Sequence, residues 1–147
     1  FHVKIWGRLV KFKMKQKVLF KHCDPAGIVF YPRYFEMIND CVEIFFYEIG
    51  VPFETLHPTS GVPTAQISTT FHAPSIHGDN LIINLGVIKI GGASLRLSIN
   101  ADCRAEQRFS SDVTIVYVNK NGRPQNWSDS IRNALTLYLR SDKWPTQ

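Results

Sequence analysis

The sequence predicts an α+β domain in which one antiparallel sheet packs on one long helix. Two observations carry this prediction. Apolar residues recur at steps of three and four between residues 32 and 49, and four long strand-like runs follow residue 63. The chain has 147 residues and is 44% hydrophobic, which suffices for one domain with its own core.

The long helix has clear start and stop signals. Pro32 suits a first helical turn, where its missing N–H costs nothing. Gly50 is typical of a helix end, and Pro52 prevents a restart. Glu36, Asn39, Asp40 and Glu43 should face away from the core, whereas the apolar stripe should consist of Phe35, Ile38, Val42, Phe45, Phe46 and Ile49.

The strands and turns follow from period-two runs and their punctuation. We expect a first strand at 15–23 and later strands at 64–72, 80–90, 94–105 and 110–119. The turns fall at 73–80, 89–94 and 118–124, and a terminal helix spans 128–139 with Ser128 or Asp129 as its N-cap.

A lone sheet leaves an outer face and its edges exposed. We expect Phe71, Leu85 and Tyr117 to cover such a face by pairing with another copy of the chain. The sequence therefore predicts a homo-oligomer, at least a dimer.

Composition excludes several classes of protein. There is no apolar run of 18 residues and therefore no expected membrane span. Three cysteines without a CxxC motif indicate reduced thiols and a cytoplasmic location. The net charge is +5, but six of the 17 basic residues lie within the first 17 positions, and no basic run with aromatics favours nucleic acid.

The chain begins with Phe1, and no secretory h-region follows. We expect residues 1–13 to be an upstream extension or tag, and 14–147, starting at Met14, to form the domain. No cluster of His, Cys and acidic residues has metal-ligand spacing, so we expect no metal.

The segment HCDPAGIVFYPRYFEM, residues 22–37, places an acid in a turn before the long helix. Gly27 permits a backbone conformation that other residues avoid. The helix start carries about half a positive charge, which would stabilise an oxygen that gains negative charge. Asp24 is then either a simple turn cap or a carboxylate for acyl transfer, as nucleophile or general base.

Asp24 to Tyr34 resembles the signature of the 4-hydroxybenzoyl-CoA thioesterase family of the hotdog-fold superfamily, D-P-A-G-I-V-x-Y-P-x-Y/F. Weaker similarity covers residues 15–125. The resemblance implies a curved sheet wrapped around a central helix, and dimers that pair into tetramers with sites at subunit interfaces. It also implies that Asp24 is the catalytic carboxylate and that the backbone N–H of Tyr31 polarises the thioester carbonyl.

The resemblance also suggests substrate-binding residues, with two departures from the family pattern. Asn39 stands where an acid often meets the ring hydroxyl, and the usual basic run before Ser94 reads Gly91-Gly92-Ala93. We expect Gly27 and Pro32 to shape the approach to the thioester, Asn39 and Ser94 to contact substrate, and Lys89 and Arg96 to be the candidates for CoA phosphates.

The expected activity is therefore hydrolysis of an acyl- or aryl-CoA thioester to a free acid and CoA, without cofactor or metal. Two alternatives remain: a thioesterase for acyl-carrier-protein substrates, and a non-catalytic acyl- or CoA-binding hotdog protein. A helix acid (Glu36, Asp40 or Glu43) is a less favoured catalyst, and a Cys23–His22 nucleophile is disfavoured because adjacent strand residues point to opposite faces.

Overall fold

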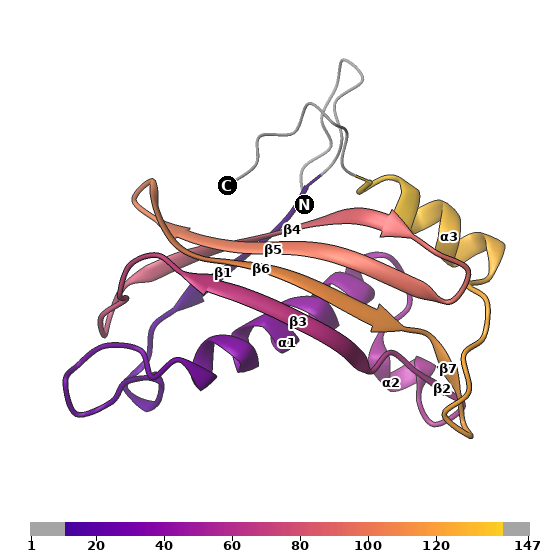
Figure 1. Ribbon diagram of the computed structural model, residues 1–147, viewed down its shortest axis with the longest axis horizontal. Coiled ribbons are helices and arrows are strands. Elements are labelled where there is room, and N and C mark those ends of the chain that lie inside the picture. Colours follow the sequence, from indigo (N-terminus) through magenta and orange to yellow (C-terminus); the bar gives the residue numbers. More distant parts are fainter. Residues whose placement is uncertain (1–10, 140–147) are drawn as a thin grey trace, which may run out of the picture.

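The computed structural model describes residues 11–139, which form a sheet, a long helix and several short elements (Figure 1). In chain order these are β1 (Phe12–Lys17), the 3₁₀ turn η1 (Phe20–His22), α1 (Pro32–Glu48), α2 (Phe53–Leu56), β2 (Ser60–Gly61), β3 (Thr64–Phe71), β4 (Asn80–Ile90), β5 (Ser94–Cys103), β6 (Glu106–Val116), β7 (Val118–Asn119) and α3 (Asp129–Thr136).

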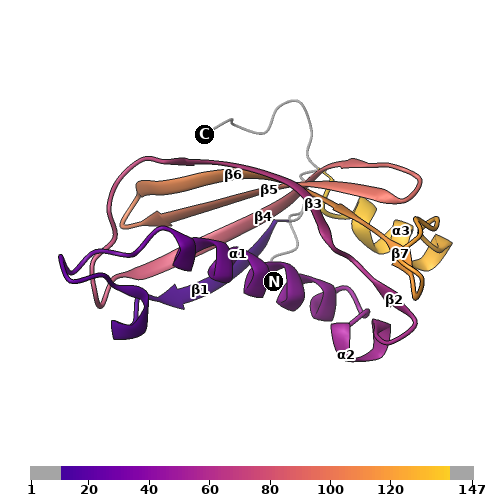
Figure 2. The ribbon, with the colours of Figure 1, turned by 60° about the horizontal axis from the view of Figure 1, so that its bottom comes forward.

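Five strands form one antiparallel sheet in the order β1-β4-β5-β6-β3. Figure 2 shows that this sheet curves over α1, which lies against its concave side. β2 and β7 pair separately as a two-stranded ribbon at one end. The predicted α+β arrangement of one sheet on one long helix is confirmed.

The core lies between α1 and the concave face of the sheet. Phe45 and Phe46 of α1 are fully buried, as the apolar stripe predicts. Phe35 and Ile49 are only half-buried, whereas Tyr34, Met37 and Cys41, which the stripe omitted, are buried. The sheet contributes alternate residues of its three central strands: Leu81, Ile83, Leu85 and Val87, then Leu95, Leu97 and Ile99, then Phe109, Val113 and Ile115.

The expectation that Phe71, Leu85 and Tyr117 cover an outer apolar face is wrong in its reason. Leu85 is fully buried in the core, Phe71 packs against Tyr34 on the concave side, and Tyr117 stacks on Trp127. The alternating register instead gives the convex face polar side chains from β5 and β6, namely Arg96, Ser98, Asn100, Asp102, Ser110, Asp112 and Thr114.

The first strand lies earlier than predicted. β1 starts at Phe12, which is buried and pairs with Leu85, so residues 12 and 13 of the expected extension belong to the sheet. The rest of that expectation concerns residues 1–10, which lie outside the described residues. After β1 the chain leaves the sheet and closes the turn η1 instead of continuing to residue 23.

The hairpin between β5 and β6 also differs. Arg104 and Ala105 form its two-residue turn with φ of 50° and 65°, so β6 starts at Glu106 rather than at 110. Ser128 is the N-cap of α3, because its hydroxyl accepts the Ile131 N–H. No helix within residues 11–139 is long and apolar enough to cross a membrane.

Candidate active site

The reactive loop, residues 22–30, is a small closed hairpin between η1 and α1. The Asp24 N–H donates to Ile28 O over 2.9 Å, and the Phe30 N–H donates to His22 O over 2.9 Å. Gly27 closes the tip with its N–H on Asp24 O, and its φ of 83° is the left-handed conformation that the sequence predicted. These backbone hydrogen bonds hold Asp24 within a closed turn.

The Asp24 carboxylate is only partly engaged by this turn. Its Oδ1 accepts the Ala26 N–H at 2.9 Å, which is the ordinary turn-capping contact. Its Oδ2 has no hydrogen-bond partner among residues 11–139, and the side chain is half-exposed. Turn capping by one oxygen thus leaves the second oxygen available for chemistry.

The start of α1 offers one free donor. Pro32 occupies the first helical turn, as expected. The Arg33 N–H donates to Phe30 O and the Tyr34 N–H to Tyr31 O. The Tyr31 N–H has no acceptor within the described part of the chain. A ligand oxygen at this helix start would therefore meet an unused N–H and the positive end of the helix dipole.

A cleft of about 470 Å³ opens beside this loop and the helix start. Four aromatic side chains, which we call the aromatic wall, gather here: Tyr31, Tyr34, Phe35 and Phe71. Tyr34 and Phe71 are stacked with ring centroids 5.7 Å apart, and Phe71 remains 45% exposed. The residues that line the cleft are Ile28, Val29, Tyr31, Tyr34, Phe71, His72, Ala73 and Pro74. Tyr31 therefore lines the cleft itself, whereas Asp24 lies beside it in the adjoining reactive loop.

Asn39 lies further along α1. It lines a narrower cleft of about 290 Å³ between α1 and β3, together with Phe35 and Ile67. It also borders a shallow hollow with Glu36 and Asp40, and Glu36 pairs with Arg33 at 2.9 Å. Phe35 belongs to the aromatic wall and to this narrower cleft, so the two clefts adjoin.

The candidates for phosphate binding lie at the other end of the sheet. Lys89 and Arg96 are cross-strand partners beside the β4–β5 turn, close to Ser94. Ala101, which pairs with Phe109 near the aromatic wall, lies seven residues along β5 from Ser94, or about 24 Å. Figure 1 shows the reactive loop and the β4–β5 turn at opposite ends. One chain therefore does not bring the two groups together.

Arg96 is moreover already paired. Its guanidinium makes a two-pronged contact with the carboxylate of Asp112 on the neighbouring strand β6. The hydrogen bonds that Arg96 donates to the Asp112 carboxylate raise the pKa of Arg96, and the carboxylate offsets much of its charge locally. Both cations are exposed, but Lys89 forms no ion pair with the described residues.

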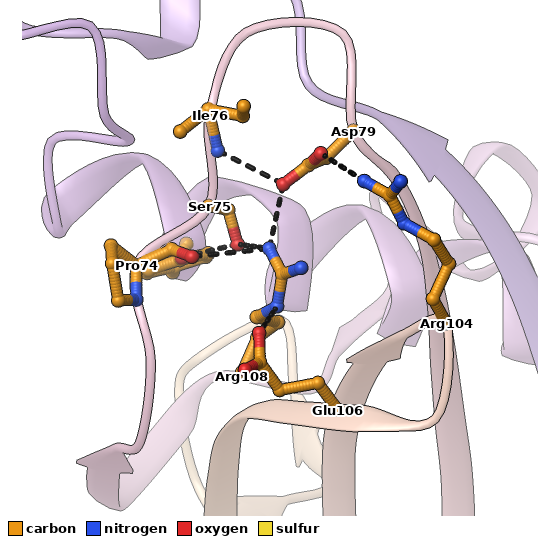
Figure 3. Close-up of polar contacts among 8 residues, drawn as sticks. Pro74, Ser75, Ile76, Asp79, Arg104, Glu106 and Arg108 are labelled. Atoms are coloured by element: carbon orange, nitrogen blue, oxygen red, sulfur yellow. Dashed lines mark hydrogen bonds and ion pairs between the residues drawn. The ribbon is translucent and has the colours of Figure 1, made fainter.

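A buried ion pair, Arg108–Asp79, lies under the reactive loop and was not predicted from the sequence. Arg108 Nη1 lies 2.6 Å from Asp79 Oδ2, and both side chains are nearly fully buried (Figure 3). Burial raises the pKa of Asp79, but the Arg108 hydrogen bond, the Ile76 N–H and the two nearby arginines outweigh burial and hold it below its usual value. The only sequence signal was the Gly-Asp pair in the turn before β4.

His22 and Cys23 have structural roles. His22 Nδ1 accepts the Leu19 N–H at 2.9 Å, and burial lowers its pKa. The Cys23 thiol donates to Leu19 O at 3.6 Å. Cys41 is buried in the core, where burial raises its pKa to about 12. Within residues 11–139 no group of three or more His, Cys, Asp or Glu side chains is arranged to hold a metal ion.

The sequence was compared with models of known protein families. The family model of the thioesterase-like superfamily matches residues 18–135, which include the reactive loop, α1 and the strands β2 to β7. The chain belongs to the thioesterase-like superfamily. No curated protein sequence matches this thioesterase-like domain.

Solved structures show that the domain has the hotdog fold. A Staphylococcus aureus protein in complex with CoA shares 17% identity at TM-score 0.86, over 97% of this chain and 94% of its own. A 1,4-dihydroxy-2-naphthoyl-CoA thioesterase from Synechocystis shares 16% identity at TM-score 0.80, over 86% of this chain and 96% of its own. A gentisyl-coenzyme A thioesterase shares 25% identity at TM-score 0.78, over 84% and 99%.

Proposed function

We propose that this thioesterase-like domain hydrolyses an acyl- or aryl-CoA thioester to a free acid and CoA, as the 4-hydroxybenzoyl-CoA thioesterase signature implies. The observation that carries the proposal is the pairing of two unused groups. One oxygen of Asp24 and the Tyr31 N–H both lack partners in the described chain, and both belong to the segment that borders the aromatic cleft.

The proposed chemistry assigns one task to each group. The thioester carbonyl oxygen lies at the Tyr31 N–H, where the helix dipole stabilises the charge that develops on it. Asp24 then attacks the carbonyl carbon, or removes a proton from an attacking water. When Asp24 attacks, the C–S bond breaks to leave an acyl–Asp24 anhydride, which water hydrolyses to the free acid and the carboxylate; when water attacks, it displaces CoA directly. In both routes CoA leaves as a thiolate that takes up a proton. Gly27 and Pro32 shape the approach.

The aromatic wall favours a flat or unsaturated acyl group. Planar groups stack on aromatic rings, and Phe71 presents a large exposed ring beside Tyr31. Two structural neighbours are named as thioesterases of gentisyl-CoA and of 1,4-dihydroxy-2-naphthoyl-CoA, which supports an aryl substrate. The Asn39 amide can donate to or accept from a ring substituent that extends into the narrower cleft.

A substrate panel tests this proposal. We expect benzoyl- and hydroxybenzoyl-CoA to be hydrolysed with kcat/KM about fivefold above acetyl- and palmitoyl-CoA, because aromatic stacking contributes about 1 kcal/mol. Free thiol release is measured at equal enzyme concentration. A uniform rate across the panel would contradict aryl selectivity, and no release from any member would contradict the hydrolase assignment.

The two alternatives have their own observations. Lys89 and Ser94 lie too far from the reactive loop to bind the CoA phosphates of the same substrate within one chain. A thioesterase for acyl-carrier-protein substrates would not need such a phosphate site. Faster turnover of acyl-carrier thioesters than of the matching CoA esters would select that function. Thermal stabilisation by CoA without thiol release would select a non-catalytic CoA-binding protein. All three cysteines are free thiols, as we expect of a cytoplasmic protein.

A second copy of the chain would complete the CoA site. β3 is an edge strand that is exposed on both faces along most of its length. Antiparallel pairing of β3 with its copy would set the Thr64 end of one strand beside the Phe71 end of the other. Because β5 starts near the Thr64 end, the partner's β4–β5 turn, with Lys89 and Ser94, would approach the reactive loop. We therefore propose a homodimer as the working unit; the family resemblance implies that such dimers pair further into a tetramer.

Lysines on this edge test the dimer. In the double variant Gln66→Lys/Ser68→Lys, lysines of the two paired β3 strands face each other across the dimer interface. The dissociation constant of the dimer should therefore rise at least about tenfold. Analytical ultracentrifugation measures the association, and turnover should fall in step with the dimer fraction. Ser98→Lys, on the same face of the interior strand β5, is the matched control. A monomeric variant with full turnover would contradict the composite site.

A further inference from the structure

Arg108 and Asp79 form a buried ion pair. Their side chains are only 7% and 5% exposed, and their closest atoms lie 2.6 Å apart. Arg104 reaches the other Asp79 oxygen at 3.2 Å from the surface, and Glu106 lies 2.9 Å from Arg108 Nε (Figure 3). A buried ion pair is a poor source of stability, because desolvation offsets its attraction. We therefore consider which other residues Arg108 and Asp79 contact.

The pair fixes one segment at several points. Besides Asp79, Arg108 Nη1 donates to Pro74 O and to Ser75 Oγ, both at 3.1 Å. Asp79 Oδ2 also accepts the Ile76 N–H at 3.0 Å. The β3–β4 connection at residues 74–79 is thus tied to the sheet strand β6 through a single guanidinium, as Figure 3 shows.

Ser75, which Arg108 holds in place, forms hydrogen bonds with both halves of the candidate site. Its backbone oxygen accepts the Val29 N–H of the reactive loop at 2.8 Å. Its hydroxyl accepts the Tyr34 hydroxyl at 2.8 Å, and Tyr34 lies in the first turn of α1. Ile28 forms a further backbone bridge with Ile76. The loop that carries Asp24 and the helix start that carries the Tyr31 N–H are therefore held by the same serine.

We propose that Ser75, anchored by Arg108 and Asp79, is a positioning residue that sets the spacing between the Asp24 carboxylate and the Tyr31 N–H. This inference rests on the proposed function. Catalytic groups must be held within about 0.5 Å of their productive geometry, and a misplacement of 1 Å costs about a hundredfold in rate. Ser75 is fully buried and does not line the cleft, so it acts through its neighbours.

A double-mutant cycle tests this role. Ser75→Ala and Tyr34→Phe each remove one end of the same hydroxyl link. Each should lower kcat at least about tenfold with KM changed less than about twofold. The double variant should be no slower than the slower single variant, because the link is already broken. Multiplying effects would overturn the shared link. Gln125→Ala, which breaks a part-buried link to Ser60 and Val118 at the other end of the molecule, is the control and should keep its kcat.

A second measurement does not depend on activity. In Ser75→Ala, amide hydrogen exchange should rise about tenfold in residues 24–31, most clearly at Val29, and stay unchanged in the interior of β5. Unchanged exchange in 24–31 would overturn the positioning role whatever happens to kcat. If wild-type protein releases no thiol from any thioester, the proposed function fails, while the exchange result still decides whether Ser75 holds the loop.

Discussion

Replacing Asp24 by asparagine should lower kcat for thioester hydrolysis by at least about a hundredfold and leave the fold intact. The amide is neutral, so it neither attacks a carbonyl carbon nor accepts a proton from water. Its side-chain oxygen can still accept the Ala26 N–H, so the turn that shapes the reactive loop is kept. Steady-state thiol release gives kcat, and circular dichroism with thermal denaturation verifies the fold.

Two further variants make the Asp24 result specific. Cys23→Ser changes the adjacent side chain, whose thiol donates to Leu19 O, as the serine hydroxyl can, and should keep full turnover. Asp24→Ala removes both oxygens and should lose stability as well as rate, since the Ala26 N–H loses its acceptor. If Asp24→Asn hydrolyses the whole substrate panel at the wild-type rate, the carboxylate has no catalytic role.

Replacing Arg108 by methionine should destabilise the protein by about 3 to 5 kcal/mol. The change keeps the length and burial of the side chain but leaves the Asp79 carboxylate buried without its main partner. Arg104 retains its contact with Asp79 at 3.2 Å from an exposed side chain, so we expect the lower end of that range. Urea denaturation measures the free energy of unfolding. Arg33→Met removes the exposed pair with Glu36 and should cost less than about 1 kcal/mol.

The pH dependence of this loss has a defined sign. In the wild type the pKa of Asp79 is held below its usual value, so its contribution is present above about pH 4 and is lost as the pH falls through the lowered pKa. Without Arg108 burial dominates, and the pKa of Asp79 should rise above its usual value. The difference in unfolding free energy between wild type and Arg108→Met should therefore be largest near pH 7 and shrink on acidification. A difference that grows toward pH 4 would contradict this account.

Local signals predicted most of the fold. The period of α1 and the flanking Pro32 and Gly50 defined the helix to within one residue at each end, because those signals lie within the element itself. The Arg104–Ala105 turn carries no Gly or Asn, so nothing local marked its left-handed backbone. β1 was displaced because Lys13, Lys15 and Lys17 alternate with residues whose burial is decided by pairing with β4. These errors arise where tertiary pairing overrides the local pattern.

The candidate site divides in the same way. Asp24, Gly27 and Tyr31 were predicted because they share one short segment, and the structure places them on one loop and helix start. Arg108 and Ser75 were missed because their roles depend on contacts with residues far along the chain, such as the 2.8 Å bond from Tyr34 to Ser75. A lone arginine in a sequence is usually a solvated surface residue, and nothing nearby indicated burial.

Two rings of the aromatic wall, Phe35 and Phe71, lie outside the short segment that carries Asp24 and the Tyr31 N–H. Phe71 ends β3 and Phe35 lies one turn into α1, whereas the Asp24 turn is closed by backbone bonds that no side chain of the wall supplies. Substitutions at Phe35 or Phe71 can therefore reshape the cleft and leave the turn intact. Such a division makes the scaffold evolvable: descendants of one ancestor can exchange substrates by single mutations while they inherit the reaction unchanged.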